Sequence, residues 1–318
     1  MEDVKVLITA HSFGSCGKAA FDILDGAKVK YSIMHRKEIF KEEDLIDEVK
    51  SFDALIVGAD VISRKVIENA PKLRIISKHG VGLDNIDLEA AKERNIVVAA
   101  AIGSNNIAVA ELTICLMLAL ARRVALCDRE VKAGEWNRYK GMELMGSTLG
   151  VIGTGKIGKE VIARMKSFGM NVLAFDLNQD KGFAKEYNVK YVPLNELLAQ
   201  ADFLCIHAPL TDSTKYLINK SNLIRIKRTA ILINTARGGI VDEDALYSAL
   251  INKEIAGAAI DTFEYEPPGR NRLLELDNVI ATPHIGAYTK EAIDKMSKYS
   301  AEAIAQFAKG ENIKNKVI

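Results

Sequence analysis

The chain has 318 residues, of which 48% are hydrophobic and 27% are charged. This length allows two cores, because one domain usually spans roughly 100 to 200 residues. The 43 Lys and Arg residues against 42 Asp and Glu residues give a net charge of +1, and no basic stripe suggests binding to nucleic acid.

The first hundred residues contain short apolar runs separated by stretches with helical spacing. This rhythm predicts a parallel sheet flanked by helices. The predicted strands are 4–10, 29–34, 54–57, 73–77 and 96–101. Because the first strand begins almost at the N-terminus, no signal peptide is predicted, and we expect a cytoplasmic protein.

A long apolar stretch at 108–121 interrupts this rhythm. It includes Glu111 and is shorter than the roughly 18 residues that a membrane span requires, so no membrane contact is expected. It predicts a buried helix, with Ser104 or Asn105 as a candidate N-cap.

A second strand series follows and predicts another doubly wound sheet. Its strands are 149–154, 171–176, 203–208, 230–235, 256–261 and 278–282. Apolar residues at helical spacing then predict a last helix over 289–310, with no strand after it.

The last helix packs most simply on the first sheet, which makes the central domain an insertion. The predicted fold class is α/β, with two doubly wound parallel-sheet domains. A Rossmann dinucleotide-binding domain (103–287) is inserted into a flavodoxin-like substrate domain (1–102 with 288–318). The chain crosses between lobes near Gly103 and Gly286, which suits a hinge.

Gly153, Gly155 and Gly158 form a G-x-G-x-x-G pattern directly after a predicted strand. These glycines permit a tight turn, the approach of a pyrophosphate and close packing of helix on strand. Asp176 ends the next strand, where a carboxylate accepts hydrogen bonds from ribose hydroxyls and repels a 2′-phosphate. The pattern therefore favours NAD over NADP.

Polar side chains gather after three later strands of the second series. Arg237 can clamp a carboxylate with its planar donors, and His284 can remove a hydroxyl proton. Glu266 can orient His284 and stabilise its charged form, and Asp261 lies at the same sheet edge. This set fits the oxidation of an alcohol next to a carboxylate.

The chain resembles the D-isomer-specific 2-hydroxyacid dehydrogenase family over nearly its full length. The resemblance rests on the ordered motifs HGVGLDNIDLEAAKERNI, NNIAVAELT, GEW, LGVIGTGKIG, HAPLTDST, NTARGGIVDEDAL, IDTFEYEP and TPHIGA. It implies that Arg237, Glu266 and His284 are catalytic. It also implies a homodimer built largely on the nucleotide domains, and no metal.

The resemblance further implies cofactor and substrate contacts. Asp261 is expected at the nicotinamide end, and Pro209 and Thr235 along the cofactor. The expected NAD site also includes the following residues of the matched motifs: Lys156, Ile157, His207, Ala208, Thr214, Ala236, Arg237, His284 and Gly286. The expected substrate contacts are Lys78, His79, Val81, Gly82, Arg237 and His284.

Within the family, the chain looks most like the short phosphoglycerate dehydrogenases. Those enzymes often carry an arginine after the third strand, where this chain has Gly58 and Ala59. Lys78 is then the candidate cation for a phosphate. Hydroxypyruvate, glyoxylate and lactate stay open as alternatives, and so does a NAD-sensing, corepressor-like binding protein.

Two further expectations concern single residues. The four cysteines form no C-x-x-C pair and are expected to be buried reduced thiols: Cys16, Cys115, Cys127 and Cys205. Trp136 is expected to be a packing anchor, either within the chain or across a dimer contact, and not a substrate residue.

Overall fold

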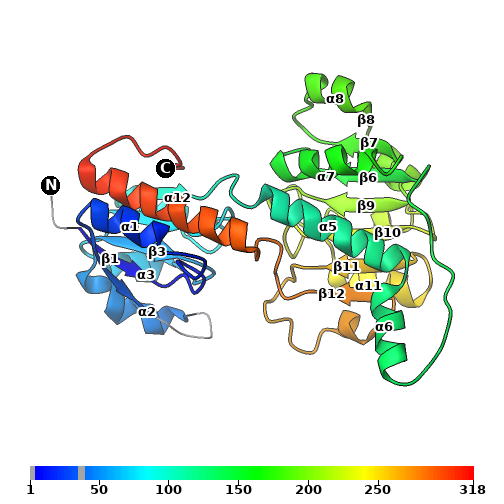
Figure 1. Ribbon diagram of the computed structural model, residues 1–318, viewed down its shortest axis with the longest axis horizontal. Coiled ribbons are helices and arrows are strands. Elements are labelled where there is room, and N and C mark those ends of the chain that lie inside the picture. The colour runs from blue at the N-terminus through cyan, green and yellow to red at the C-terminus, as the bar shows by residue number, and fades with distance from the viewer. Residues whose placement is uncertain (1–3, 35–39) are drawn as a thin grey trace. The chain divides into compact units, whose positions relative to one another are not determined.

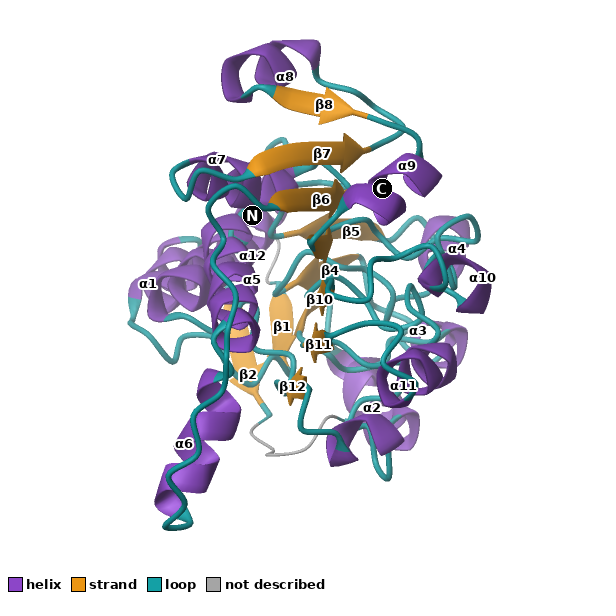
Figure 2. Ribbon diagram, turned by 90° about the vertical axis from the view of Figure 1, so that its right-hand side faces the viewer, coloured by secondary structure: helices purple, strands orange, loops and turns teal. Residues whose placement is uncertain are grey.

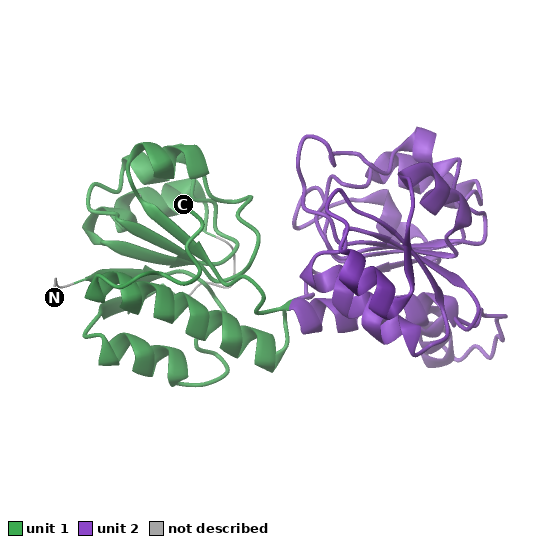
Figure 3. Ribbon diagram, turned by 90° about the horizontal axis from the view of Figure 1, so that it is seen from above, with its two compact units in different colours: residues 1–105, 287–318 green, residues 106–286 purple. Residues whose placement is uncertain are grey.

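Figure 1 shows the computed structural model, which describes residues 4–34 and 40–318. The chain divides into two compact units, which Figure 3 distinguishes by colour. Unit 1 comprises residues 1–105 and 287–318, and unit 2 comprises residues 106–286. Unit 2 is therefore continuous in sequence, whereas unit 1 is assembled from both ends of the chain.

Unit 1 is built on a five-stranded sheet with the order β2-β1-β3-β4-β5. All its strand pairs are parallel. The strands are β1 (Lys5–Ile8), β2 (Lys30–Ile33), β3 (Ala54–Val57), β4 (Ile75–Lys78) and β5 (Val97–Ala100). This order is the flavodoxin-like one expected from the sequence.

Helices cover both faces of the unit 1 sheet. Helices α1 (Ala19–Gly26) and α12 (Lys290–Lys309) share one apolar core with it, and Figure 1 shows them side by side. The opposite core takes residues from α2 (Glu42–Glu48), α3 (Arg64–Glu68) and α4 (Leu88–Glu93). A 3-10 turn, η1 (Val49–Ser51), follows α2. Every residue of β3 and β4 is buried, as expected of a sheet covered on both faces.

Unit 2 contains a seven-stranded parallel sheet with the order β12-β11-β10-β9-β6-β7-β8. Its first six strands in chain order follow the Rossmann arrangement 3-2-1-4-5-6. The strands are β6 (Thr148–Ile152), β7 (Asn171–Phe175), β8 (Val189–Tyr191), β9 (Phe203–Ile206), β10 (Ile231–Asn234), β11 (Gly257–Ile260) and β12 (Val279–Ala281). The two-sheet α/β fold predicted from the sequence is confirmed.

Two apolar cores hold the unit 2 helices to the sheet. Figure 2 shows α5 (Asn106–Ala121) and α7 (Lys156–Lys166) on one side, and α9 (Leu194–Gln200) and α11 (Glu243–Ile251) on the other. The remaining elements are α6 (Val124–Lys132), α8 (Lys181–Tyr187), α10 (Lys220–Leu223) and the 3-10 turn η2 (Arg272–Glu275). Each fully buried leucine or isoleucine in these cores contributes about 1.5–3 kcal/mol.

Helix α12 is capped at both ends. The Thr289 hydroxyl accepts a hydrogen bond from Ala292 N–H, and Gly310 takes a left-handed φ of 70° at the C-terminus. After this helix, the chain runs along β5 and forms an antiparallel bridge between Ala99 and Lys316. This backbone pairing, which the sequence did not predict, covers the free edge of the unit 1 sheet.

Several local expectations were wrong. Strand β8 was missed because it has three residues and lies at the sheet edge. Neither predicted N-cap of α5 acts as one: the Ser104 hydroxyl donates to Ala101 O at 2.6 Å, and Asn105 Oδ1 has no partner within residues 4–34 and 40–318. The sequence alone does not show which backbone group each of these side chains hydrogen-bonds to.

Burial of three of the four cysteines also differs from expectation. Cys205 is buried, whereas Cys16 and Cys115 are exposed and Cys127 is partly exposed. Trp136 is 76% exposed, so it anchors no packing within its own chain. No helix in the described part of the chain has both the length and the apolarity needed to span a membrane.

Candidate active site

The predicted catalytic side chains lie on loops that leave three neighbouring strands of unit 2. Arg237 follows β10, and His284 follows β12. Asp261 and Glu266 follow β11, which lies between those two strands in the sheet. Because the strands are parallel, their carboxyl ends share one edge, where open α/β sheets bind ligands.

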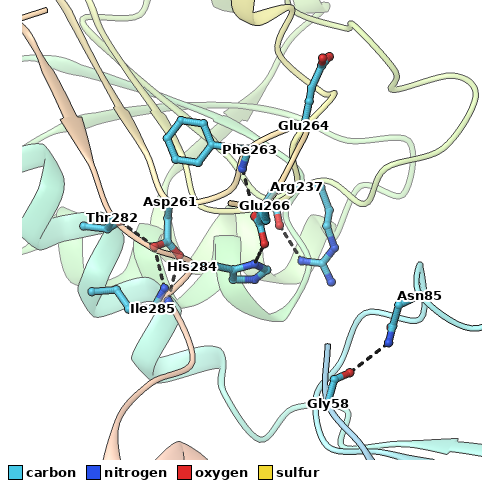
Figure 4. A network of polar contacts seen from close by, with 12 residues as sticks. Gly58, Asn85, Arg237, Asp261, Phe263, Glu264, Glu266, Thr282, His284 and Ile285 are labelled. Atoms are coloured by element: carbon cyan, nitrogen blue, oxygen red, sulfur yellow. Dashed lines mark hydrogen bonds and ion pairs between the residues drawn. The ribbon is translucent and has the colours of Figure 1, made fainter. Parts of the chain in front are cut away.

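Glu266 and His284 form an ion pair at this edge. His284 Nδ1 lies 2.7 Å from Glu266 Oε2, and Figure 4 shows the two side chains in contact. Glu266 Oε1 accepts a second hydrogen bond, from Phe263 N–H at 3.1 Å. The carboxylate thus uses one oxygen to hold its own loop and the other to orient the imidazole.

The charge state of Glu266 follows from its surroundings. Burial raises the pKa of Glu266, but the hydrogen bond and charge of His284, the Phe263 N–H and the Arg237 charge outweigh it, so this pKa lies below its ordinary value. Glu266 is therefore a carboxylate at neutral pH. On the other side of the His284 ring, Nε2 makes no hydrogen bond with a described residue and is able to exchange a proton with a ligand.

Arg237 is the cationic member of the group. Its Nη1 donates to the main-chain oxygen of Ala236 at 2.7 Å, and Figure 4 shows its guanidinium next to Glu266. A planar guanidinium presents paired donors that match a carboxylate. The three side chains combine a cation able to bind a carboxylate, an imidazole able to exchange a proton and an anion able to stabilise that imidazole when it is charged.

Two residues that sequence reasoning did not single out shape the Arg237 loop. Asn234 Nδ2 donates to Arg237 O at 2.9 Å, and its Oδ1 accepts from Ala236 N–H at 3.1 Å. At Gly238, a Cβ atom would lie only 2.0 Å from Phe263 O, so the loops after β10 and β11 touch through backbone. Both residues lie inside the NTARGG motif, where an asparagine within an apolar strand and a glycine pair directly after Arg237 were the available signals.

The glycine motif of unit 2 has the geometry that a dinucleotide requires. Gly153 has a φ of 92°, and a Cβ there would lie 2.7 Å from Ala208 N. A Cβ at Gly158 would meet Gly153 O at 2.1 Å, whereas nothing lies within 4 Å of one at Gly155. Gly155 starts α7, whose N-terminal N–H groups suit a pyrophosphate, and Lys156 and Ile157 form its first turn.

Asp176 directly follows β7, next to the glycine turn. Its Oδ2 accepts hydrogen bonds from Thr154 N–H at 2.6 Å and Thr154 Oγ1 at 3.0 Å, and its Oδ1 accepts from Asn178 N–H at 2.8 Å. Burial raises the pKa of Asp176, but these hydrogen bonds together lower it by more. The pKa of Asp176 therefore lies below its ordinary value. The side chain therefore stays anionic at neutral pH.

Other predicted cofactor residues follow β9 and β10. Both ring nitrogens of His207 are buried without a partner among the described residues, and burial lowers the pKa of His207 to about 4. Its neutral imidazole is available to a ligand. Thr214 Oγ1 donates to Pro209 O at 2.6 Å and fixes that loop. Thr235 Oγ1 lies 2.8 Å from Thr113 Oγ1 of α5, both buried.

The predicted substrate residues of unit 1 lie at and just after the end of β4. Lys78 is buried, and its Nζ donates to Gly58 O and to Asn85 Oδ1, the latter at 2.6 Å. His79 is buried as well, and its Nε2 lies 3.0 Å from Ser297 Oγ. Val81 and Gly82 are partly exposed. Both longer side chains are thus engaged inside unit 1, and a substrate contact for any of these residues stays a prediction.

The sheet order, the glycine turn and the polar edge together define a dinucleotide-binding oxidoreductase fold. Residues 114–286 match the NAD binding domain of the D-isomer specific 2-hydroxyacid dehydrogenases. With the relatives described next, this match shows that the chain belongs to that family and that this region is an NAD-binding domain.

The relatives carry different names. The chain is 46% identical over 280 residues to the D-3-phosphoglycerate dehydrogenase of Methanocaldococcus jannaschii, covering 87% of this chain but 53% of that protein. It is 42% identical over 275 residues to the glyoxylate reductase of Korarchaeum cryptofilum, covering 84% and 83%. The chain thus spans about half the length of the Methanocaldococcus protein.

A solved structure is similar to this chain over nearly its whole length. The D-lactate dehydrogenase of Aquifex aeolicus, complexed with NAD and lactic acid, has a TM-score of 0.84 and 30% identity, and 96% of each chain is covered. The family resemblance inferred from the sequence motifs is confirmed.

Proposed function

We propose that this protein is an NAD-dependent dehydrogenase that interconverts small D-2-hydroxy acids and 2-oxo acids. The observation that carries the proposal is the His284–Glu266 pair, with Arg237 beside it, at the ligand-binding edge of an NAD-binding sheet. Family membership supports the same reaction class.

In the reducing direction, the Arg237 guanidinium binds the substrate carboxylate and polarises the neighbouring carbonyl. His284, protonated, gives its Nε2 proton to the carbonyl oxygen. Glu266 stabilises the imidazolium before transfer and keeps Nδ1 turned away from the substrate. In the oxidising direction, neutral His284 accepts the hydroxyl proton. NAD supplies or accepts the hydride when bound.

The chain's own residues account for the choice of NAD. Gly153 and Gly158 allow the turn and helix α7 to pack against neighbouring backbone, and nothing lies within 4 Å of a Cβ at Gly155, which leaves room for a pyrophosphate at the helix N-terminus. Asp176 places a negative charge where NADP carries its 2′-phosphate. We therefore propose a preference for NAD.

Among substrates, we propose 3-phosphoglycerate first, with hydroxypyruvate, glyoxylate and lactate as alternatives. Identity to the Methanocaldococcus phosphoglycerate dehydrogenase supports the first choice, and identity to the Korarchaeum glyoxylate reductase supports an alternative. The Lys78 ammonium already donates to Gly58 O and Asn85 Oδ1, so it is a shared rather than a dedicated cation for a phosphate.

The test is NADH oxidation, followed by absorbance, with 3-phosphohydroxypyruvate, hydroxypyruvate, glyoxylate and pyruvate at equal NADH. We expect turnover that a His284→Gln variant loses.

A preference for the phosphorylated acid below about tenfold, or roughly 1.4 kcal/mol in the barrier, would argue against 3-phosphoglycerate as substrate. The Lys78→Ala variant then tests the contribution of that lysine. NADH binding without turnover of any acid would instead favour a NAD-sensing binding protein.

We also propose a homodimer formed through unit 2. Several apolar side chains on α6 and in the loop after it are more than half exposed, which supports a protein partner there. They are Val124, Val131, Trp136 and Met145. Light scattering should give twice the mass of one chain, and a single-chain mass would refute the dimer.

A further inference from the structure

Asp261 gathers an unusual number of hydrogen bonds from one short segment. It is 1% exposed. Its Oδ1 accepts from Thr282 Oγ1 at 2.7 Å and from Ile285 N–H at 2.8 Å, and its Oδ2 accepts from Gly286 N–H at 2.9 Å. Its main-chain oxygen accepts from His284 N–H at 2.9 Å. One residue of the β11 loop therefore binds four groups of the β12 loop (Figure 4).

The segment that Asp261 binds contains a backbone conformation that side-chain-bearing residues rarely adopt. His284 has a φ of 52°, in the left-handed region. A histidine stays in this region only where its surroundings hold it there, and such residues concentrate at functional sites. The hydrogen bonds at Thr282, His284, Ile285 and Gly286 bracket this residue on both sides.

The fit around Gly286 is equally close. A Cβ atom there would lie 3.1 Å from Asp261 Oδ2 and 3.3 Å from Val109 Cγ2 of α5. A side chain at position 286 would therefore be crowded by both the Asp261 carboxylate and helix α5. The hydrogen bonds to Asp261 fix the direction in which the His284 side chain leaves the backbone.

We propose that Asp261 is a positioning residue for proton transfer: its buried carboxylate holds His284 in the left-handed conformation that aims Nδ1 at Glu266 Oε2. This role rests on the proposed function for its catalytic consequence. It is a role in addition to the contact with the nicotinamide end that the family resemblance implies, because these hydrogen bonds are made to the β12 loop. The two roles predict different consequences for variants.

The test compares Thr282→Val, Asp261→Asn and a matched control, Thr262→Val. Thr282→Val removes one hydrogen bond to Asp261 and leaves its charge. Thr262 is the next residue along, and its buried hydroxyl has no partner among the described residues, so the same change there leaves the Asp261 contacts intact. Thermal unfolding of each variant checks that it is folded.

Three quantities are measured for each variant: kcat with its pH profile, the dissociation constant of NADH by fluorescence, and the ring ¹⁵N signals of histidine-labelled protein. The His284 signals are assigned by their loss in His284→Gln. We expect kcat to fall about fivefold in Thr282→Val, the effect of one hydrogen bond. In Asp261→Asn we expect a fall of about a hundredfold, as a misplaced catalytic group produces.

In both variants, the His284 Nδ1 signal should lose the signature of a hydrogen bond to a carboxylate, whereas NADH binding should change less than about threefold. Thr262→Val should match the wild type. Wild-type His284 signals in Thr282→Val and Asp261→Asn would overturn the proposal. So would weaker NADH binding by Asp261→Asn with an unchanged His284 signal, since that result assigns Asp261 to the cofactor alone.

If Asp261→Asn is unfolded, Thr282→Val decides the question. The ¹⁵N signals need no turnover, so an inactive wild type would refute the proposed function while the signals still decide whether Asp261 positions His284.

Discussion

At the scale of single residues, the candidate active site depends on how protein contacts set the charge of a few side chains. Glu266 is partly buried, which raises its pKa, yet hydrogen bonds from His284 and Phe263 help to keep this pKa below its ordinary value. His79 and His207 are the opposite case, because burial favours their neutral forms. His79 and His207 are thus neutral inside the fold, whereas the ring of His284 contacts the Glu266 carboxylate.

The Glu266→Gln substitution tests the coupling between Glu266 and His284. Removing the carboxylate removes the anion that stabilises protonated His284 and orients its ring, so proton transfer by this histidine should slow. We expect kcat for reduction to fall about tenfold to a hundredfold at pH 7. The measurement is the rate of NADH oxidation from pH 5 to pH 10.

Glu254→Gln is the control for this change. Glu254 is exposed in the segment before β11, at the opposite end of that strand from the site. A Glu266→Gln profile that overlays those of Glu254→Gln and the wild type would show that the two residues are not coupled.

His79 gives a prediction for stability against pH. Burial, with a smaller effect of the Lys78 charge, lowers the pKa of His79 to about 4 from 6.5. Above pH 6.5, His79 is neutral in both folded and unfolded chains; as pH falls from 6.5 to 4, only the unfolded chain takes up the proton. Folding therefore loses up to about 3 kcal/mol across this range.

In His79→Gln, the urea midpoint followed by circular dichroism should fall less between pH 6.5 and pH 4 than in the wild type. His11→Asn, a change at an exposed histidine, should keep the wild-type slope. Equal slopes in His79→Gln and the wild type would contradict the assignment of a buried, neutral His79.

At the scale of elements, the site is held by contacts between loops rather than by the strands alone. Gly238 brings the β10 loop onto the backbone of Phe263, and Asp261 binds the β12 loop to the β11 loop. Glu243, at the start of α11, adds a third support: its Oε1 accepts from Glu264 N–H at 2.8 Å. Direct contacts therefore connect the loops that carry Arg237, Glu266 and His284.

The Gly238→Ala substitution tests this linkage. A Cβ placed 2.0 Å from Phe263 O forces the β10 and β11 loops apart. We expect a loss of stability of about 1–3 kcal/mol and a fall in kcat/KM of about a hundredfold. Urea unfolding and steady-state rates measure these effects.

The matched control is Gly26→Ala, in α1, where nothing lies within 4 Å of the added Cβ. That change should leave the rates unaltered and raise stability by up to about 1 kcal/mol. Wild-type kcat/KM in Gly238→Ala would show that the contact between the two loops is not required.

At the scale of the whole molecule, the sequence predicts the architecture well and the loop geometry poorly. The alternation of strands and helices predicts both sheets, because each buried strand carries its apolar run in a contiguous segment. The edge strand β8 and the pairing of the chain end with β5 have no such run and were missed. Whether a segment pairs with an edge strand depends on which other part of the chain lies next to that edge in the fold.

The same contrast applies to the site. The motifs predict which strands carry Arg237, Glu266 and His284, since parallel strands place their carboxyl ends at one edge. They do not predict the left-handed backbone of His284 or the four hydrogen bonds to Asp261, because these depend on the contact of two loops far apart in sequence.

The central claim is that this chain transfers hydride between NADH and the carbon next to a carboxylate, with His284 moving the proton. The most direct measurement uses NADH with deuterium at both C4 positions of the nicotinamide and follows the deuterium into the product of a 2-oxo acid. We predict deuterium at C2 of the D-2-hydroxy acid, formed by the wild type and not by His284→Gln. An L-product, a product without deuterium, or equal product from His284→Gln would contradict the claim.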